Sequence, residues 1–387
     1  MPLPLFALFF TAFSIGTGEF VIAGLLPDVS ANLGVTIPTA GYLVTAYAIG
    51  IAIGGPLTAL LVSRLPRKPA LLWLIGAFTF GTALCALAPS YPWLMVARVF
   101  VSFSHGAFFG VAAIVATNLV PPEKRGSAVA LLLAGITVAN ILGVPAGTAI
   151  GNAFGWRATF WAVGLLTALA LAATAILLPK SIAGEHKQGN LGQEFRALGR
   201  QVVYLSLAVI VIAMIGQFSL FTYIAPLLTT VTGVSENLVP WLLLLFGVGS
   251  TLGVLAGGRL ADWKLMPSLI GMLAMQAVVY AALAWCIHDA LATSILIVLW
   301  GAASFAFGAP VQTRVLHWTA DAPNLASTLI PTAFNIGIAL GATLGAAALD
   351  QNWGYDSLPW IGFVTALAAG ALALVSWALE KGAMATV

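Results

Sequence analysis

The chain has 387 residues, of which 61% are hydrophobic and only 7% are charged. A soluble domain carries about 25% charged residues, so this composition, with a mean hydropathy of +1.04, excludes a soluble globular protein. The net charge of +3 comes from basic residues scattered singly along the chain. Without a basic patch, a nucleic-acid-binding surface is also excluded, and the composition indicates an integral membrane protein.

The apolar sequence falls into twelve runs, each near the ~20 residues that a membrane-spanning helix needs. Because the bilayer core offers no water to unpaired backbone groups, runs of this length predict helices. The predicted spans are residues 3–26, 39–62, 69–88, 92–118, 127–150, 157–179, 201–229, 239–260, 268–287, 291–314, 325–348 and 357–379. The expected fold class is therefore all-α, with twelve transmembrane helices.

The loop charges predict the orientation of these helices. If the amino terminus is cytoplasmic, the inner loops hold thirteen of the 15 Lys and Arg residues, and the outer loops hold only Arg157. This asymmetry follows the positive-inside rule, and we expect both termini in the cytoplasm. The longest loop, residues 181–200, divides the chain into an amino-terminal six-helix bundle, 1–180, and a carboxy-terminal one, 201–387.

Spans five and eleven repeat a glycine pattern. Each carries three glycines at positions i, i+4 and i+8, at an offset of 194 residues. The glycines are Gly143, Gly147 and Gly151 in the first half and Gly337, Gly341 and Gly345 in the second. Glycines at this spacing share one helix face, against which another helix can pack closely. A duplicated six-helix unit is the simplest account, although glycine pairs also recur by chance in membrane helices.

Glu19 is a single carboxylate in the otherwise apolar first span, between Gly18 and Phe20. A charge in the bilayer core costs roughly 2.5–3.5 kcal/mol on insertion scales, so it is retained where it has a partner, water or a function. Counting ~1.5 Å per helical residue places Arg98 of span four at a similar depth. Two interpretations stay open: a permanent structural ion pair, or a proton-carrying site whose charge Arg98 balances.

His105 follows Arg98 by seven residues, which places both side chains on one face of span four. Imidazole titrates near neutrality and can relay protons. It can equally hydrogen-bond a neighbouring backbone carbonyl without a chemical role, and the sequence does not decide between the two.

Isolated polar and aromatic side chains in the spans predict a mostly apolar cavity with few polar groups. The candidates are Phe20, Tyr42, Thr45, Asn140, Gln217, Phe218, Phe221, Tyr223 and Asn335. Aromatic residues at helical spacing are also common in helix cores, so each candidate has an alternative as a packing residue.

Several segments resemble motifs of the major facilitator superfamily. Residues 258–264, at the end of span eight and in the loop after it, include Gly258 and Asp262 and resemble the superfamily's loop motif. The loop after span two shares the basic residues Arg64, Arg67 and Lys68, but places Ser63 where the motif has an acid. This departure removes the acid of the inner latch in the amino-terminal half.

The transmembrane motifs extend the resemblance to the whole chain. The run Gly143-Val144-Pro145-Ala146-Gly147 resembles the antiporter motif of drug:proton antiporters, and the segment around Arg98 resembles the span-four arginine motif. Span one is similar to a bacterial branch of drug or sugar efflux permeases of the arabinose-efflux type. We expect two pseudo-symmetric bundles that rock around a midplane site.

The resemblance implies a monomeric proton-coupled antiporter of the bacterial inner membrane that exports small, largely apolar compounds or drugs, with Glu19 as coupling acid. Export of sugars or related metabolites is the alternative, and coupling to another cation stays open. From a different class, Ser63 raises a non-transporting receptor or scaffold. No phosphate-binding loop, catalytic carboxylate pair or metal-ligand cluster is present in the sequence, so we expect no enzyme, cofactor or metal.

Overall fold

The computed structural model describes residues 1–179, 200–320 and 323–385, with the backbone alone for 323–327 and 381–385. Every regular element in these ranges is helical. Twelve helical stretches are long and apolar enough, by length and composition, to cross a membrane, and they correspond to the twelve predicted spans. The predicted fold class is confirmed. The orientation stays a prediction, and the predicted linker lies outside the described residues except for Arg200.

The chain divides into two compact units. Unit 1 comprises Met1–His186 and Ser235–Leu244, and unit 2 comprises Lys187–Val234 and Leu245–Val387. The boundaries predicted for two bundles, 1–180 and 201–387, stay a prediction, because the observed units also assign the beginning of span eight to unit 1.

The helices of unit 1 are α1 (Leu3–Phe20), α2 (Ile22–Leu33), α3 (Ile37–Ile49), η1 (Gly50–Gly54), α4 (Gly55–Val62), α5 (Arg67–Ala86), α6 (Tyr91–Asn118), η2 (Pro122–Lys124), α7 (Arg125–Val138), η3 (Ala139–Gly143), α8 (Val144–Phe154), α9 (Trp156–Leu177) and η4 (Glu236–Leu238). Those of unit 2 are α11 (Gln201–Phe221), α12 (Ile224–Thr230), α14 (Leu265–Cys286), α15 (Ala290–Ala306), α16 (Gly308–Trp318), α17 (Pro323–Asp350) and α18 (Ser357–Ala385). Helix α13 (Val239–Trp263) begins in unit 1 and continues in unit 2.

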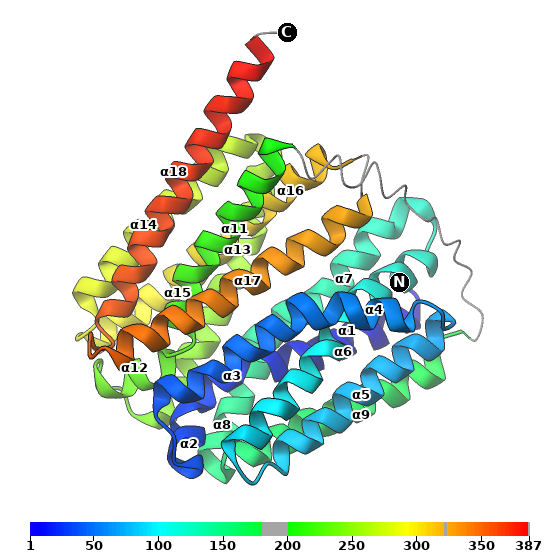
Figure 1. Ribbon diagram of the computed structural model, residues 1–387, viewed down its shortest axis with the longest axis horizontal. Coiled ribbons are helices and arrows are strands. Elements are labelled where there is room, and N and C mark those ends of the chain that lie inside the picture. Colours follow the sequence, from blue (N-terminus) through cyan, green and yellow to red (C-terminus); the bar gives the residue numbers. More distant parts are fainter. Residues whose placement is uncertain (180–199, 321–322, 386–387) are drawn as a thin grey trace. The chain divides into compact units, whose positions relative to one another are not determined.

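In unit 1, α1 packs against α7 and α9, and α5 packs against α6 and α9 (Figure 1). The glycines of span five face span one: a Cβ atom on Gly147 would lie 2.5 Å from the Val21 side chain, and Gly143 lies against Thr17. Two π-helical turns, η1 and η3, interrupt spans two and five. Such turns widen a helix locally and are frequent at functional sites.

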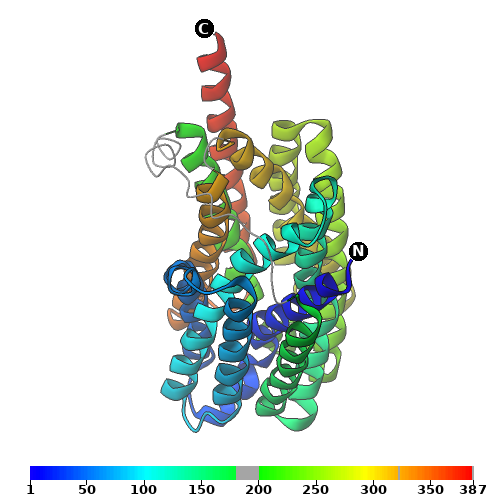
Figure 2. The ribbon, with the colours of Figure 1, turned by 90° about the vertical axis from the view of Figure 1, so that its right-hand side faces the viewer.

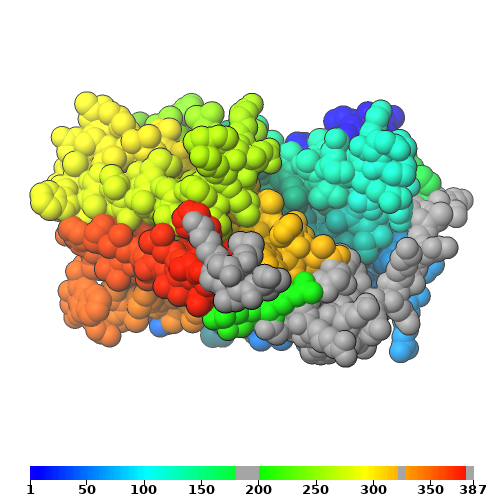
Figure 3. Space-filling view, turned by 90° about the horizontal axis from the view of Figure 1, so that it is seen from above, coloured from blue at the N-terminus to red at the C-terminus, as the bar shows by residue number. Residues whose placement is uncertain are grey.

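In unit 2, α11 packs between α17 and α18 (Figure 1; Figure 2 gives the perpendicular view). The glycines of span eleven face span seven, because a Cβ atom on Gly341 would lie 2.5 Å from the Ile215 carbonyl oxygen. Helices α14 (yellow) and α18 (red) lie against each other in Figure 3. Span one therefore meets span five through glycines in unit 1, and span seven meets span eleven through glycines in unit 2. These are corresponding pairs of spans, as a duplicated six-helix unit predicts.

Three spans are broken near a proline. Span one turns at Val21, span seven at Thr222 and Tyr223, and span ten at Phe307. Pro27, Pro226 and Pro310 follow these turns by a few residues. Proline lacks the N–H that would bond the carbonyl four residues earlier, so a helix kinks on its amino-terminal side.

Candidate functional site

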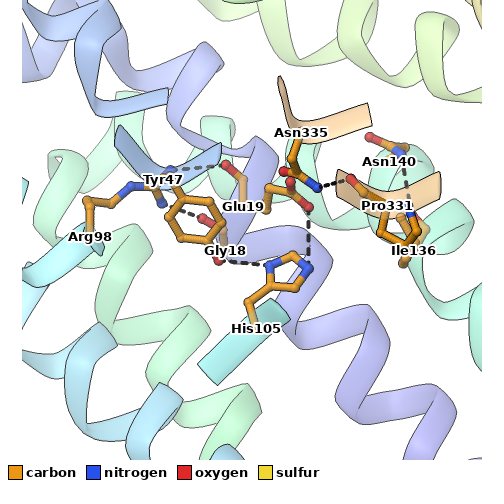
Figure 4. A network of polar contacts seen from close by, with 9 residues as sticks. All are labelled: Gly18, Glu19, Tyr47, Arg98, His105, Ile136, Asn140, Pro331 and Asn335. Carbon is orange, nitrogen blue, oxygen red and sulfur yellow. Dashed lines mark hydrogen bonds and ion pairs between the residues drawn. The ribbon is translucent and has the colours of Figure 1, made fainter. Parts of the chain in front are cut away.

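Three helices of unit 1 meet at Arg98: its own helix α6, the carboxyl end of α1, and α3. The Arg98 side chain is 1% exposed. Its Nη1 donates to the Gly18 carbonyl oxygen at 2.7 Å, and its Nη2 donates to the Glu19 carbonyl oxygen at 3.3 Å (Figure 4). The last carbonyls of a helix carry partial negative charge and lack intrahelical donors. The guanidinium therefore caps α1 immediately before its break.

The carboxylate of Glu19 faces His105. Its Oε2 lies 3.9 Å from His105 Nε2, and the two side chains are 12% and 7% exposed. The sequence suggested Arg98 as the charge partner of this carboxylate. The structure brings Glu19 and Arg98 together, but the guanidinium binds the Glu19 backbone, and no ion pair joins the two side chains in the described ranges.

Tyr47 of α3 contacts both Arg98 and His105. The Arg98 Cζ lies 4.1 Å from the centroid of the Tyr47 ring, a cation–π geometry. The Tyr47 hydroxyl lies 3.1 Å from His105 Nδ1, so the imidazole has Tyr47 at one nitrogen and Glu19 at the other (Figure 4). Tyr47 was not predicted from the sequence, because one tyrosine in an apolar span carries no signal that separates it from a packing residue.

Close packing of span two on span four holds Tyr47 beside His105. A Cβ atom on Gly106 would lie 2.6 Å from the Gly55 Cα atom and 3.0 Å from the Ile51 carbonyl oxygen. Only glycine allows the two backbones to approach this closely. The π-helical turn η1 begins three residues after Tyr47, so Tyr47 lies just before the segment of span two that contacts Gly106.

The two asparagines among the predicted cavity residues bond to their own helices. Asn140 Nδ2, in η3, donates to the Ile136 carbonyl oxygen at 3.4 Å, and Asn335 Nδ2, in α17, donates to that of Pro331 at 2.9 Å (Figure 4). The side chains are 5% and 8% exposed. Each amide is thus held on its helix, and Asn335 Oδ1 has no hydrogen-bond partner among the described residues.

The other predicted cavity residues differ in how far their side chains are buried. Those of unit 1, namely Phe20, Tyr42 and Thr45, are partly exposed. In unit 2, Gln217 and Phe218 are buried, and the Phe221 ring centroid lies 5.0 Å from that of Phe246. The Tyr223 hydroxyl donates to the Ala342 carbonyl oxygen at 2.9 Å. These unit 2 side chains pack within their own unit, and the cavity role of the whole set stays a prediction.

The loop motifs lie at helix ends. Lys68 Nζ donates to the carbonyl oxygens of Ala175 and Leu178, at 2.6 and 2.5 Å, and so caps the carboxyl end of α9. Arg64 follows α4 and is exposed, and Arg67 begins α5. Gly258 and the exposed Asp262 lie in the last turns of α13, whereas the buried Pro145 lies in the first turn of α8. A conformational role for these residues stays a prediction.

The sequence pattern of the Major Facilitator Superfamily matches residues 8–317. The chain belongs to the Major Facilitator Superfamily. The family predicted from the motifs is thereby confirmed. The chain is 40% identical over 363 residues to the inner membrane transport protein YdhP of Escherichia coli (strain K12), and the match covers 94% of this chain and 93% of that protein.

A second relative is the chloramphenicol resistance protein of Streptomyces lividans, 37% identical over 356 residues, which cover 92% of this chain and 91% of that protein. Among solved structures, a bacterial homolog of the human lysosomal transporter Spinster, in an inward-facing and unoccupied conformation, matches with a TM-score of 0.74. The match has 18% identity and covers 96% of this chain and 94% of that chain. At this identity the likeness shows the shared fold.

Proposed function

We propose that this superfamily member is a proton-coupled antiporter of the bacterial inner membrane that exports small, largely apolar compounds, with Glu19 as the coupling acid. One observation carries the proposal: a nearly buried carboxylate lies between a titratable imidazole at 3.9 Å and a helix end capped by a buried guanidinium. The relative YdhP is named an inner membrane transport protein, which supports a location in the inner membrane.

Arg98 allows Glu19 to exist with and without its proton. Guanidinium stays charged in proteins, so the local charge is +1 when Glu19 is neutral and zero when it is ionised. An ionised carboxylate in an apolar site needs a compensating charge or water. A movement that changes the water access of Glu19, or its distance from Arg98, therefore changes how strongly Glu19 holds a proton.

Transport requires that proton and substrate bind the alternating states with different affinity. In the state open to the outside, Glu19 would take up a proton as substrate leaves. In the state open to the cytoplasm, substrate binding would favour release of the proton. The superfamily's rocking of two halves around a central site would join the two half-reactions.

The amides of Asn140 and Asn335 and the Tyr223 hydroxyl donate to backbone carbonyl oxygens, which leaves few hydrogen-bonding groups for a sugar and favours small, largely apolar compounds. A relative named for resistance to chloramphenicol supports the same substrate class. A non-transporting receptor, the alternative from another class, predicts no substrate flux at all.

The test is substrate-triggered proton movement in proteoliposomes that enclose a pH-sensitive dye, with chloramphenicol, lipophilic drugs and sugars as additions. We expect a pH change with the wild type and none with Glu19→Gln. Asp28→Asn is the matched control, because Asp28 is a carboxylate on the adjoining helix α2, outside the apolar span.

Equal proton movement by the wild type and Glu19→Gln would refute Glu19 as the coupling acid. A response to sugars alone would replace the substrate class. Substrate flux without any proton movement would refute proton coupling, and no flux with any compound would favour the receptor alternative.

A further inference from the structure

Tyr47, His105 and Glu19 form a series of proton-exchanging groups from three helices of unit 1. The phenol oxygen lies 3.1 Å from Nδ1, and Nε2 on the opposite side of the same ring lies 3.9 Å from the Glu19 carboxylate (Figure 4). We propose that protons reach Glu19 through Tyr47 and the neutral ring of His105. This inference rests on the proposed function, and it assigns the route and a proton-relaying residue, Tyr47.

The two protonation states of Glu19 require opposite tautomers of His105. An ionised Glu19 can only accept hydrogen bonds, so His105 Nε2 carries the ring hydrogen and the Tyr47 hydroxyl donates a hydrogen bond to Nδ1. When Glu19 is protonated its O–H faces Nε2, so Nδ1 carries the hydrogen and donates to the Tyr47 oxygen. A phenol both donates and accepts, and Tyr47 therefore fits both tautomers.

Conversion between the states moves protons without leaving a charge on the ring. The Nε2–H bond breaks as the Glu19 O–H bond forms, and the Tyr47 O–H bond breaks as the Nδ1–H bond forms. Tyr47 is 2% exposed, so the phenol oxygen then regains one proton, from a hydronium ion, when a movement of the helices admits water to it. The net change is one proton added to the Glu19 carboxylate, and reversal of the steps releases it.

Arg98 favours this route over one through an imidazolium ion. Its guanidinium lies against the Tyr47 ring, at 4.1 Å from the centroid, where it attracts negative charge that develops on the phenol as its proton leaves. The same cation repels a positive charge on His105. The further titratable group near Tyr47 is the buried thiol of Cys85 on α5, which packs against α6.

One movement is needed before the last transfer. The distance of 3.9 Å between Nε2 and Oε2 exceeds the upper limit of hydrogen-bonding reach, about 3.2 Å, by about 0.7 Å. It is also too short to hold a water molecule in line between the two atoms. The Glu19 carboxyl group must therefore turn toward the ring, which makes the transfer dependent on the conformation of the α1 end that Arg98 caps.

Tyr47→Phe tests the route, because it keeps the ring under Arg98 and removes only the hydroxyl. Tyr91→Phe is the matched control: the Tyr91 hydroxyl donates to the Thr39 carbonyl oxygen at 2.6 Å and takes no part in the series. The readout is the rate and the final extent of proton movement in the proteoliposomes, measured by stopped flow.

We expect Tyr47→Phe to slow proton movement by about a hundredfold, the lower end of what a positioned acid–base group contributes. The final extent should be unchanged, because Glu19 still titrates, and Tyr91→Phe should match the wild type in both. A wild-type rate in Tyr47→Phe would overturn the route. So would loss of rate and extent together, since Tyr47 would then hold the site rather than conduct protons.

The tautomer of His105 gives a second measurement that needs no substrate and separates this inference from the proposed function. In ¹⁵N NMR of the wild type in lipid, the His105 signals, assigned with His105→Asn, should change from Nε2–H to Nδ1–H on acidification. One tautomer at all pH values, or a doubly protonated ring, would overturn the inference even if proton-coupled transport were observed.

Discussion

Gly106→Ala should separate the helices that hold Tyr47 beside His105. The added Cβ atom would lie 2.6 Å from the Gly55 Cα atom, where ordinary contacts begin at 3.4 Å, so the backbones must move apart by about 0.8 Å. The neighbours are backbone atoms and cannot rotate away. Forced overpacking costs about 1–3 kcal/mol, which exceeds the gain of up to about 1 kcal/mol that alanine brings to a helix.

Gly110→Ala is the matched control, because Gly110 lies one turn further along α6, is exposed, and has no atom within 4 Å of its added Cβ position. Gly110→Ala should therefore gain only the stabilisation that comes from the higher helix propensity of alanine. We expect Gly106→Ala to be about 1–3 kcal/mol less stable than Gly110→Ala, measured as thermal unfolding in lipid nanodiscs by tryptophan fluorescence. Gly106→Ala should also slow proton movement in proteoliposomes. Equal stability of the two variants would refute the close-contact reasoning.

Two predictions concern groups at the ends of the spans. Glu380→Gln should lower the thermal stability of unit 2 by about 2 kcal/mol, because it leaves Arg314, which is 1% exposed and bonded to Glu380 Oε2 at 2.8 Å, without its counter-ion. Arg314→Met in the same chain should restore part of the loss, and no recovery in the double variant would argue against this pair. Burial and the neighbouring Glu236 raise the pKa of Asp28 above its ordinary value, so this carboxyl stabilises the fold below its unfolded pKa and loses that contribution as the pH rises through its folded pKa. Asp28→Asn should therefore raise the unfolding temperature at about pH 7 and reduce its change between about pH 4 and pH 7; an unchanged pH dependence would contradict this assignment.

The twelve spans were predictable because their signal is composition, which does not depend on tertiary contacts. The glycine faces were predictable for a related reason, since spacing by four residues fixes one helix face, and that face meets span one in unit 1 and span seven in unit 2. Three glycines of α13, Gly249, Gly253 and Gly257, were not singled out from the sequence, although all three lie against carbonyl groups of span ten. Their function as a face depends on a partner helix that the sequence does not identify.

The geometry at Glu19 was less predictable, because helical counting gives depth and face but no side-chain rotamer. Counting placed Glu19 and Arg98 at one depth, and the residues do meet there. The break of span one at Val21 could not be located from Pro27 alone, yet this break exposes the carbonyls that bind Arg98. Without that helix end, the Glu19 carboxylate would be the remaining acceptor for the guanidinium.

In the proposed mechanism, the break also gives one arginine both a structural role and a role in coupling. A guanidinium carries five donors in a rigid fork, and two of its nitrogens are bound to the end of α1 while its face lies on Tyr47. A charge that appears on Glu19 therefore attracts a group that already holds the backbone of the same residue. A shift of Arg98 toward the carboxylate would weaken its bonds to the carbonyls of Gly18 and Glu19. We therefore expect a single side chain to couple the protonation of Glu19 to the angle between α1 and α2.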